Sequence, residues 1–301
     1  MNRSYTALLA IAFLAGALVA GAPPLAPAQD QPPSPAEVQS LTARVVANQH
    51  RNDQSLEQFE RIEHDWMHKP GATTTATQET LNRILPTGTG IIRLPLAAPG
   101  KPADPVAYRQ QLEYLAQVLG SVAQPDSIEQ QTLVRYRKHQ QEHADMVTNV
   151  GNAYHFSWLG RETRDGRLLV KLAMDPNLNY RATSIQAEVL QHVRAVVWID
   201  ESAGQVVHLE AQATSDISIG AGIIAKVYRG GRFVMDEAEV APGIWEPVRY
   251  QYDFDGRKFV FPFGDHEITE FSQYRRVGPP AEELQAIRNE LNTPAGDPPR
   301  P

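Results

Sequence analysis

Cysteine is absent from this 301-residue sequence. Its absence excludes disulfide bonds, a thiol nucleophile, thiolate metal sites and a lipid anchor on an N-terminal cysteine. The chain is long enough to bury a core without disulfides. In an exported protein, a lack of cysteine fits a Gram-negative periplasm better than a eukaryotic secretory route, where small domains often depend on disulfides.

Long apolar segments are also scarce, and the one that stands out covers residues 7–19. Arg3 precedes it, and Ala26-Pro27-Ala28 follows it with the small residues that a signal peptidase recognises. This order predicts a secretory signal peptide over residues 1–28, cleaved before Gln29. The alternative is a transmembrane anchor, which needs about 20 apolar residues, but prolines interrupt this segment too early. We therefore expect a periplasmic protein that is not membrane-spanning.

Clustered positive charge is missing as well. The sequence has 28 basic and 35 acidic residues, a net charge of -7. An acidic chain without a basic stripe is not expected to bind nucleic acid, whose phosphates need clustered Lys and Arg. Walker A and G-x-S-x-G motifs are absent, and no cofactor is predicted. The adjacent acids Asp200-Glu201 and Asp236-Glu237 stand near expected strand ends, where such pairs are usually solvated.

Helix signals occupy the first half of the chain. Ser34-Pro35-Ala36-Glu37 forms a capping box, and apolar residues follow it at helical spacing. Asp104-Pro105 starts a second helix, and Pro125 starts a third that runs to about Val150 with one narrow apolar stripe. Residues 56–66 suggest a strand, whereas the proline-rich residues 86–105 predict mostly turns and irregular structure.

Strand patterns occupy the second half, and the short turns between them predict an antiparallel meander. The expected strands cover residues 153–158, 168–174, 194–200, 205–213, 223–228, 231–240, 244–254, 257–263 and 268–277. A short helix and a disordered proline-rich tail are expected over residues 278–301. The sequence thus predicts the α+β class, with a curved antiparallel β-sheet and helices covering one face.

The segment His139-Gln140-Gln141-Glu142-His143 matches the H-x-x-E-H zinc motif. Two histidines four residues apart on a helix share a face and can bind one zinc ion, while the glutamate activates a bound water. The neighbouring residues are polar, however, and no third ligand stands in a recognisable motif. We therefore predict that His139 and His143 bind no metal, and a zinc hydrolase is kept as an alternative.

Large apolar residues lie at alternate positions of several expected strands, so they share one face of the sheet. We expect them to line an apolar ligand pocket between the sheet and the helices. An ordinary packed core is the alternative. The predicted pocket wall comprises Trp158, Leu172, Trp198, Leu209, Tyr252 and Phe261.

Four strand segments carry a resemblance to a known family. They are Val197-Trp198-Ile199-Asp200, Val207-His208-Leu209-Glu210, Gly243-Ile244-Trp245-Glu246-Pro247 and Phe271-Ser272-Gln273-Tyr274-Arg275. In these the chain resembles the periplasmic lipoprotein-carrier superfamily, the LolA-like half-barrel proteins. The resemblance implies one domain over residues 29–277, with a helical insertion at about 104–150, whose cavity holds acyl chains or another apolar ligand. No functional residue of the carriers matches by position.

The first functional hypothesis is therefore a non-enzymatic periplasmic protein that binds a lipid, a lipoprotein or another apolar ligand. The alternative is an envelope scaffold or sensor that binds another protein, with a filled sheet core.

Overall fold

The structure is a computed structural model that describes residues 31–68, 77–98, 101–102, 104–123, 127–182, 184–219, 225–259 and 261–293. The predicted signal peptide and the predicted tail beyond residue 293 lie outside these residues. The helices are α1 (Pro35–Leu56), α2 (Pro105–Ala123), α3 (Ser127–Ala153), α4 (Ile185–Val189) and α5 (Pro280–Asn292). The strands are β1 (Phe59–His68), β2 (Thr77–Pro86), β3 (Ile91–Ala98), β4 (Lys101–Pro102), β5 (Tyr154–Arg164), β6 (Arg167–Pro176), β7 (Val193–Asp200), β8 (Gln205–Ala213), β9 (Ile217–Ile219), β10 (Ala225–Val227), β11 (Arg232–Ala241), β12 (Ile244–Lys258) and β13 (Phe261–Arg276).

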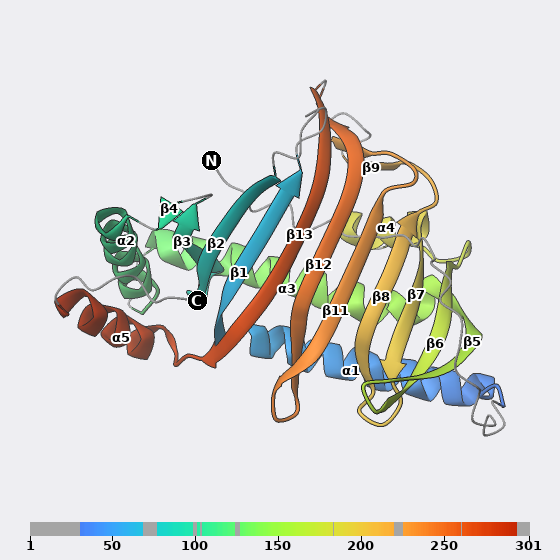
Figure 1. Cartoon of the computed structure of the whole chain (residues 1–301). Helices are drawn as coiled ribbons and strands as arrows, with labels where there is room; N and C mark the ends of the chain where they lie inside the picture. The colour runs from blue at the N-terminus through green and yellow to red at the C-terminus, as the bar shows by residue number, and fades with distance from the viewer. Residues whose placement is uncertain are drawn as a thin grey trace.

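Within the described residues, the 13 strands form one open antiparallel sheet (Figure 1). Its order is β4-β3-β2-β1-β13-β12-β11-β8-β7-β6-β5, and β9 and β10 join it beside β12. Strands β1 and β13 are neighbours, so the two ends of the strand series meet inside the sheet. Strands β4 and β5 form opposite edges, so the sheet does not close on itself.

Helices α1, α3 and α4 lie on one face of the sheet, which we call the inner face (Figure 1). Helix α1 begins with the predicted capping box, in which Ser34 accepts from the Glu37 amide and the Glu37 carboxylate accepts from the Ser34 amide. Its first half packs apolar side chains, Val38, Leu41 and Val45, against the inner-face core. That core takes buried residues from β5 to β8, β11 and β12, including Leu172, Val197, Ala211, Phe233 and Phe254.

Helices α2 and α5 cover the opposite, outer face at the β1–β3 end. Ile62 of β1 packs in their apolar cluster together with Leu85 and Leu94. Its neighbour Arg61 points the other way and lies over the Phe271 ring, which contacts inner-face Tyr250. Alternation along β1 therefore assigns the two helical layers to opposite faces.

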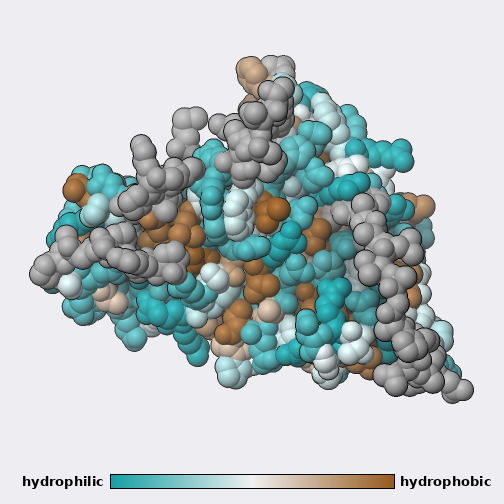
Figure 2. Space-filling model, in the orientation of Figure 1, coloured by the Kyte–Doolittle hydropathy of each residue, from teal (hydrophilic) through white to brown (hydrophobic). Residues whose placement is uncertain are grey.

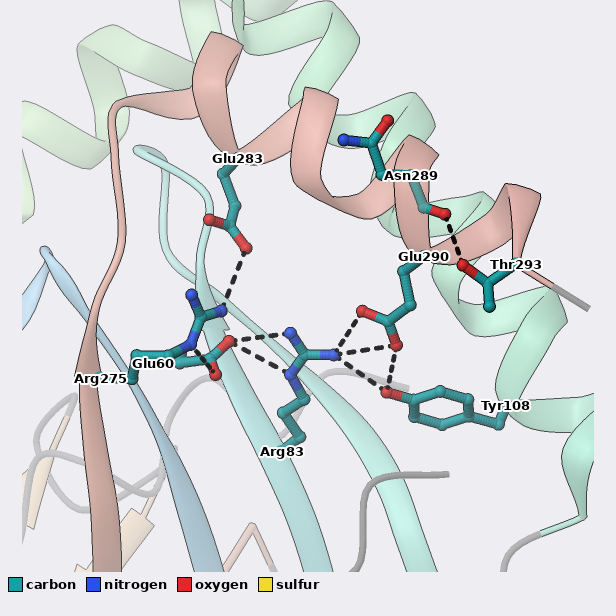
Figure 3. A network of polar contacts seen from close by, with 8 residues as sticks. All are labelled: Glu60, Arg83, Tyr108, Arg275, Glu283, Asn289, Glu290 and Thr293. Carbon is teal, nitrogen blue, oxygen red and sulfur yellow. Dashed lines mark hydrogen bonds and ion pairs between the residues drawn. The ribbon is translucent and has the colours of Figure 1, made fainter. Parts of the chain in front are cut away.

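A buried ion network fixes α2 and α5 to the outer face (Figure 3). Arg83 of β2, 7% exposed, donates to the Glu60 carboxylate at 2.9 Å and to the Glu290 carboxylate of α5 at 2.9 Å. Its Nη1 also donates to the Tyr108 hydroxyl of α2 at 3.0 Å. Arg275 of β13 donates to Glu60 at 2.7 Å, so one arginine pair connects three strands and two helices.

The predicted α+β class and the curved antiparallel sheet are confirmed. Two details differ from the expectation. The helices cover parts of both faces, because β1 to β3 also carry apolar residues on the outer face that need their own cover. Strand β3 forms inside the proline-rich stretch 86–105, where Pro95 is exposed near the sheet edge. No helix among the described residues combines the length and apolarity required to cross a membrane.

Candidate functional site

A row of aromatic rings runs along the inner face of β11, β12 and β13. The Phe233 ring lies 5.6 Å from the rings of both Tyr250 and Tyr252, measured between centroids. Tyr252 lies 6.1 Å from Phe254, and Tyr250 lies 5.5 Å from Phe271. These separations are favourable for aromatic pairs. We call these five residues the aromatic row, and they form one continuous apolar surface.

The second half of α1 is held to the sheet by amides instead of apolar side chains. Asn48 and Asn52 are each 4% exposed, at positions where a packed helix would carry leucine. The Asn48 amide donates to the carbonyl of Gly204 in the β7–β8 turn at 2.7 Å. The Asn52 amide donates to the Gln205 side chain at 3.0 Å. Because water can satisfy the same groups, lifting this half of α1 costs less than exposing a leucine core.

Helix α3 adds a second polar layer. None of its residues from 130 to 152 is fully buried. Its contacts with α1 are polar: Tyr136 donates to Glu57, His143 bonds to Asp53 at 3.1 Å, and Thr148 bonds to His50 at 3.0 Å. Helices α1 and α3 are therefore joined to each other by polar contacts, although the first half of α1 packs apolar side chains against the core below.

Two carboxyl groups are buried on the inner face near α1. The residue Glu237 is 3% exposed, and Glu246 is 1% exposed. Within the described residues, no hydrogen-bond partner meets either oxygen of Glu237 or Oε1 of Glu246. Burial, with the charge of Asp53, raises the pKa of Glu237 to about 8. Burial, with the charge of Glu237, raises the pKa of Glu246 to about 8, although Arg61 lowers it in part. Both groups therefore carry a proton at neutral pH.

This pair is not predicted by the sequence pattern, because adjacent acids such as Asp236-Glu237 are usually solvated. The alternation of β11 contains the signal: Phe233, Met235 and Glu237 occupy the same face, and the first two are apolar. A glutamate that falls at the same alternate positions of a strand as the core residues is expected to be buried, whereas a glutamate in a turn is expected to be solvated.

Four of the six predicted pocket residues share the inner-face core: Trp158, Leu172, Leu209 and Tyr252. Trp198 lies on the outer face instead, with Lys171 Nζ 4.3 Å from its ring centroid and the His208 ring 4.8 Å away. Its neighbours Val197 and Ile199 are the ones that enter the inner core. Phe261 is 71% exposed at the start of β13, beyond the covered part of the sheet. Neither Trp198 nor Phe261 can line the predicted pocket.

The two histidines of the H-x-x-E-H segment have protein partners. His143 bonds to Asp53, and this bond raises its pKa although burial lowers it. His139 Nδ1 lies 3.3 Å from Glu142. In the part of the chain that the structure describes, no group of three or more potential ligand residues is placed to hold a metal ion. That His139 and His143 bind no metal stays a prediction.

Two surface hollows stand out among the described residues. One, of about 640 Å³, is lined by Gln130, Gln131, Val134 and Arg135 of α3. The other, of about 620 Å³, lies at the start of α1 and includes Arg44, Arg161 and Glu201. Neither of these two hollows is lined by the aromatic row.

Comparison with known proteins finds relatives in structure only. No family model matches the chain, and no curated protein matches its sequence. A LolA superfamily protein of Nitrosomonas europaea is similar, with 12% identity, coverage of 82% of this chain and 96% of that chain, and a TM-score of 0.30. A DUF1329 family protein of Desulfovibrio piger gives 12% identity, 80% and 93% coverage, and a TM-score of 0.30. A domain assigned to outer-membrane lipoprotein sorting, from Vibrio parahaemolyticus, gives 10% identity, 83% and 99% coverage, and 0.31.

The LolA-like resemblance stated from the sequence thus recurs among the solved structures. Likeness at this level does not decide what the chain binds. That question rests on the residues of the inner face.

Proposed function

We propose that the chain is a non-enzymatic periplasmic binding protein whose inner face takes an extended apolar ligand, such as the acyl chain of a lipid or lipoprotein. One observation carries the proposal: a continuous aromatic row lies under helices that bury asparagines and contact each other through polar groups. An apolar surface with a cover of this kind can exchange the cover for a ligand.

The energetics favour such an exchange. Each methylene that leaves water contributes about 0.8 kcal/mol, so a chain of about ten methylenes gives roughly 8 kcal/mol before ordering costs. The Asn48 and Asn52 amides lose their turn partners when α1 lifts, but water replaces them, and the net contribution of such a hydrogen bond is only about 1 kcal/mol.

Neighbouring residues of β12 test the binding face. Tyr252 belongs to the aromatic row, whereas Gln251 points to the outer face and accepts from Arg249 at 3.0 Å. Tyr252→Ser should weaken binding of a fluorescent fatty acid about ten-fold, because one ring of ligand contact is lost. Gln251→Ser, the matched control, should bind within about two-fold of the unchanged chain. Equal affinities of the two variants in a fluorescence titration would contradict a ligand site on the inner face.

A reversible cross-link tests displacement of α1. The Arg44 Cγ lies 2.9 Å from the position that a Cβ would occupy at Gly204, so cysteines at these two positions bring their sulfurs within bonding reach. No native cysteine competes. Oxidised Arg44→Cys/Gly204→Cys should bind the fatty acid at least about ten-fold more weakly than the same protein after reduction. The reduced protein is the matched control, since it contains the same strain at Gly204. Unchanged affinity on oxidation would show that α1 stays in place during binding.

A further inference from the structure

The β12–β13 hairpin extends past the covered sheet. Its strands, of 15 and 16 residues, are the longest that the structure describes. The end of β12 and the start of β13 stand at the top of the molecule in the view of Figure 1. We call Arg257, Lys258, Phe259 and Phe261 the hairpin tip.

The hairpin tip exposes two phenylalanines. Phe259 is 52% and Phe261 is 71% exposed, and no other phenylalanine among the described residues is exposed. Phe263, two residues further on, packs its ring beside Gly256 and contacts the inner-face core. The hairpin therefore passes from buried to exposed aromatic residues within a few positions. Exposed phenylalanine at one site indicates an apolar partner for that site.

The backbone of the turn holds Phe259 outward at a conformational cost. Its φ is 54°, in the left-handed region that two-residue hairpin turns normally fill with Asn, Asp or Gly. Arg257 Nη1 donates to the Phe259 carbonyl at 2.9 Å and secures this conformation. A large apolar side chain in a strained turn is a feature that folding alone does not require.

Basic residues stand next to the two phenylalanines in the sequence and in the strand register. Lys258 is exposed, Arg257 precedes it, and Lys226 of β10 is the register partner of Arg257. Lys226 pairs with Asp216, whose carboxylate lies 2.7 Å from Lys226 Nζ, so the positive charge beside the rings comes from Arg257 and Lys258. In a chain of net charge -7, the hairpin tip contains these two basic residues and no acidic residue. Aromatic residues beside Lys and Arg fit the interface of a membrane with anionic headgroups.

We propose that the hairpin tip docks on the surface of a membrane that contains anionic phospholipid. Docking of this kind is peripheral, since two rings and their basic neighbours enter only the headgroup region. It goes beyond ligand binding on the inner face, and it involves different residues.

Vesicle flotation of the full chain tests the docking. With vesicles of phosphatidylcholine and phosphatidylglycerol at about 3:1, Phe259→Ser/Phe261→Ser should lower the bound fraction at least about five-fold. Lys258→Glu should weaken binding to these vesicles, and pure phosphatidylcholine vesicles should bind the unchanged chain about three-fold less. The matched control is Tyr114→Ser/Leu178→Ser, which removes apolar side chains that are 55% and 88% exposed elsewhere and should float normally.

Normal flotation of the Phe259→Ser/Phe261→Ser variant, or no flotation of the unchanged chain, would overturn the proposal. Equal binding to neutral and anionic vesicles would overturn the choice of anionic lipid. Circular dichroism and fatty-acid binding of each variant show that the inner face is intact. A failure of docking is thereby distinguished from a failure of ligand binding.

Discussion

Arg83→Ala is expected to lower the free energy of unfolding by about 3–5 kcal/mol, the cost of removing one partner from a buried ion network. Arg83 stands between the carboxylates of Glu60 and Glu290, and its own side chain is 9% exposed. Without it, the Glu60 and Glu290 carboxylates lose the cation between them (Figure 3), and the Glu60 side chain is only 13% exposed. Helix α5 then loses its main polar contact with β2. Urea unfolding measures the loss, and hydrogen exchange should show it first in residues 280–292.

Arg109→Ala is the matched control for Arg83→Ala. Arg109 lies on α2, donates to the Leu291 carbonyl of α5, and pairs with Glu113 at 3.6 Å, but its side chain is 46% exposed. An exposed pair of this kind contributes at most about 1 kcal/mol. A second variant, Arg83→Met with Glu60→Met, removes both partners of the most buried pair and should cost less than Arg83→Ala. A loss below about 1 kcal/mol in Arg83→Ala would show that the network does not hold α5.

Most elements of the fold could be predicted because capping and periodicity are local signals. The starts of α1 and α2 follow from Ser34 and Asp104, and β8 occupies residues 205–213, as the alternation predicts. The hairpin β12–β13 could not be predicted in the same way. The sequence suggests a break at Asp255-Gly256, yet both residues lie within β12, opposite Gly264 and Phe263.

The reason lies in a contact with a third strand. A Cβ at Gly256 would clash with the Lys226 carbonyl, so the glycine is needed for the close approach of β10 and not for a turn. The turn falls at Phe259, which no turn rule selects. A contact of this type, between strands that are distant in the sequence, cannot be inferred from residues that are adjacent in the sequence.

The apolar character of the candidate site could be predicted from the sequence, but only some of the residues that form it could be identified. Alternation along each strand separates the residues of the two faces. On β7, Val197 and Ile199 both enter the inner-face core, so Trp198 between them faces outward, and the size of its ring does not make it a pocket residue. The polar cover was visible in the narrow stripe of the α3 sequence. The buried asparagines of α1 were not, since their partners come from a turn about 150 residues away.

The buried carboxyl pair should make the protein most stable at mildly acidic pH. The pKa of each of Glu237 and Glu246 is raised to about 8, whereas an unfolded chain has a glutamate pKa near 4.5. Between these two values the folded state binds more protons than the unfolded state, so stability falls as pH rises from about 4.5 to about 8. Hydrogen bonds to Asp236 and Glu210 raise the pKa of His208 despite its burial, and this works in the same direction. The lowered pKa values of Glu60 and Asp236, both partly buried and paired with cations, act oppositely and only below about pH 4.5.

Glu237→Gln removes one of these titrations while keeping the shape of the side chain. At pH 5 the native carboxyl is already protonated, so we expect a change of less than about 1 kcal/mol. At pH 8 to 9 the native carboxylate has to ionise without a partner, and the variant should be more stable by several kcal/mol, at about 1.4 kcal/mol for each unit of pKa shift. Urea midpoints measured from pH 5 to pH 9 should fall steeply for the unchanged chain and less steeply for Glu237→Gln. Glu113→Gln, which removes the same charge from the exposed face of α2, should leave the slope unaltered. Parallel curves for the unchanged chain and Glu237→Gln would mean that Glu237 is solvated in the folded protein, and α1 would then not seal the inner face.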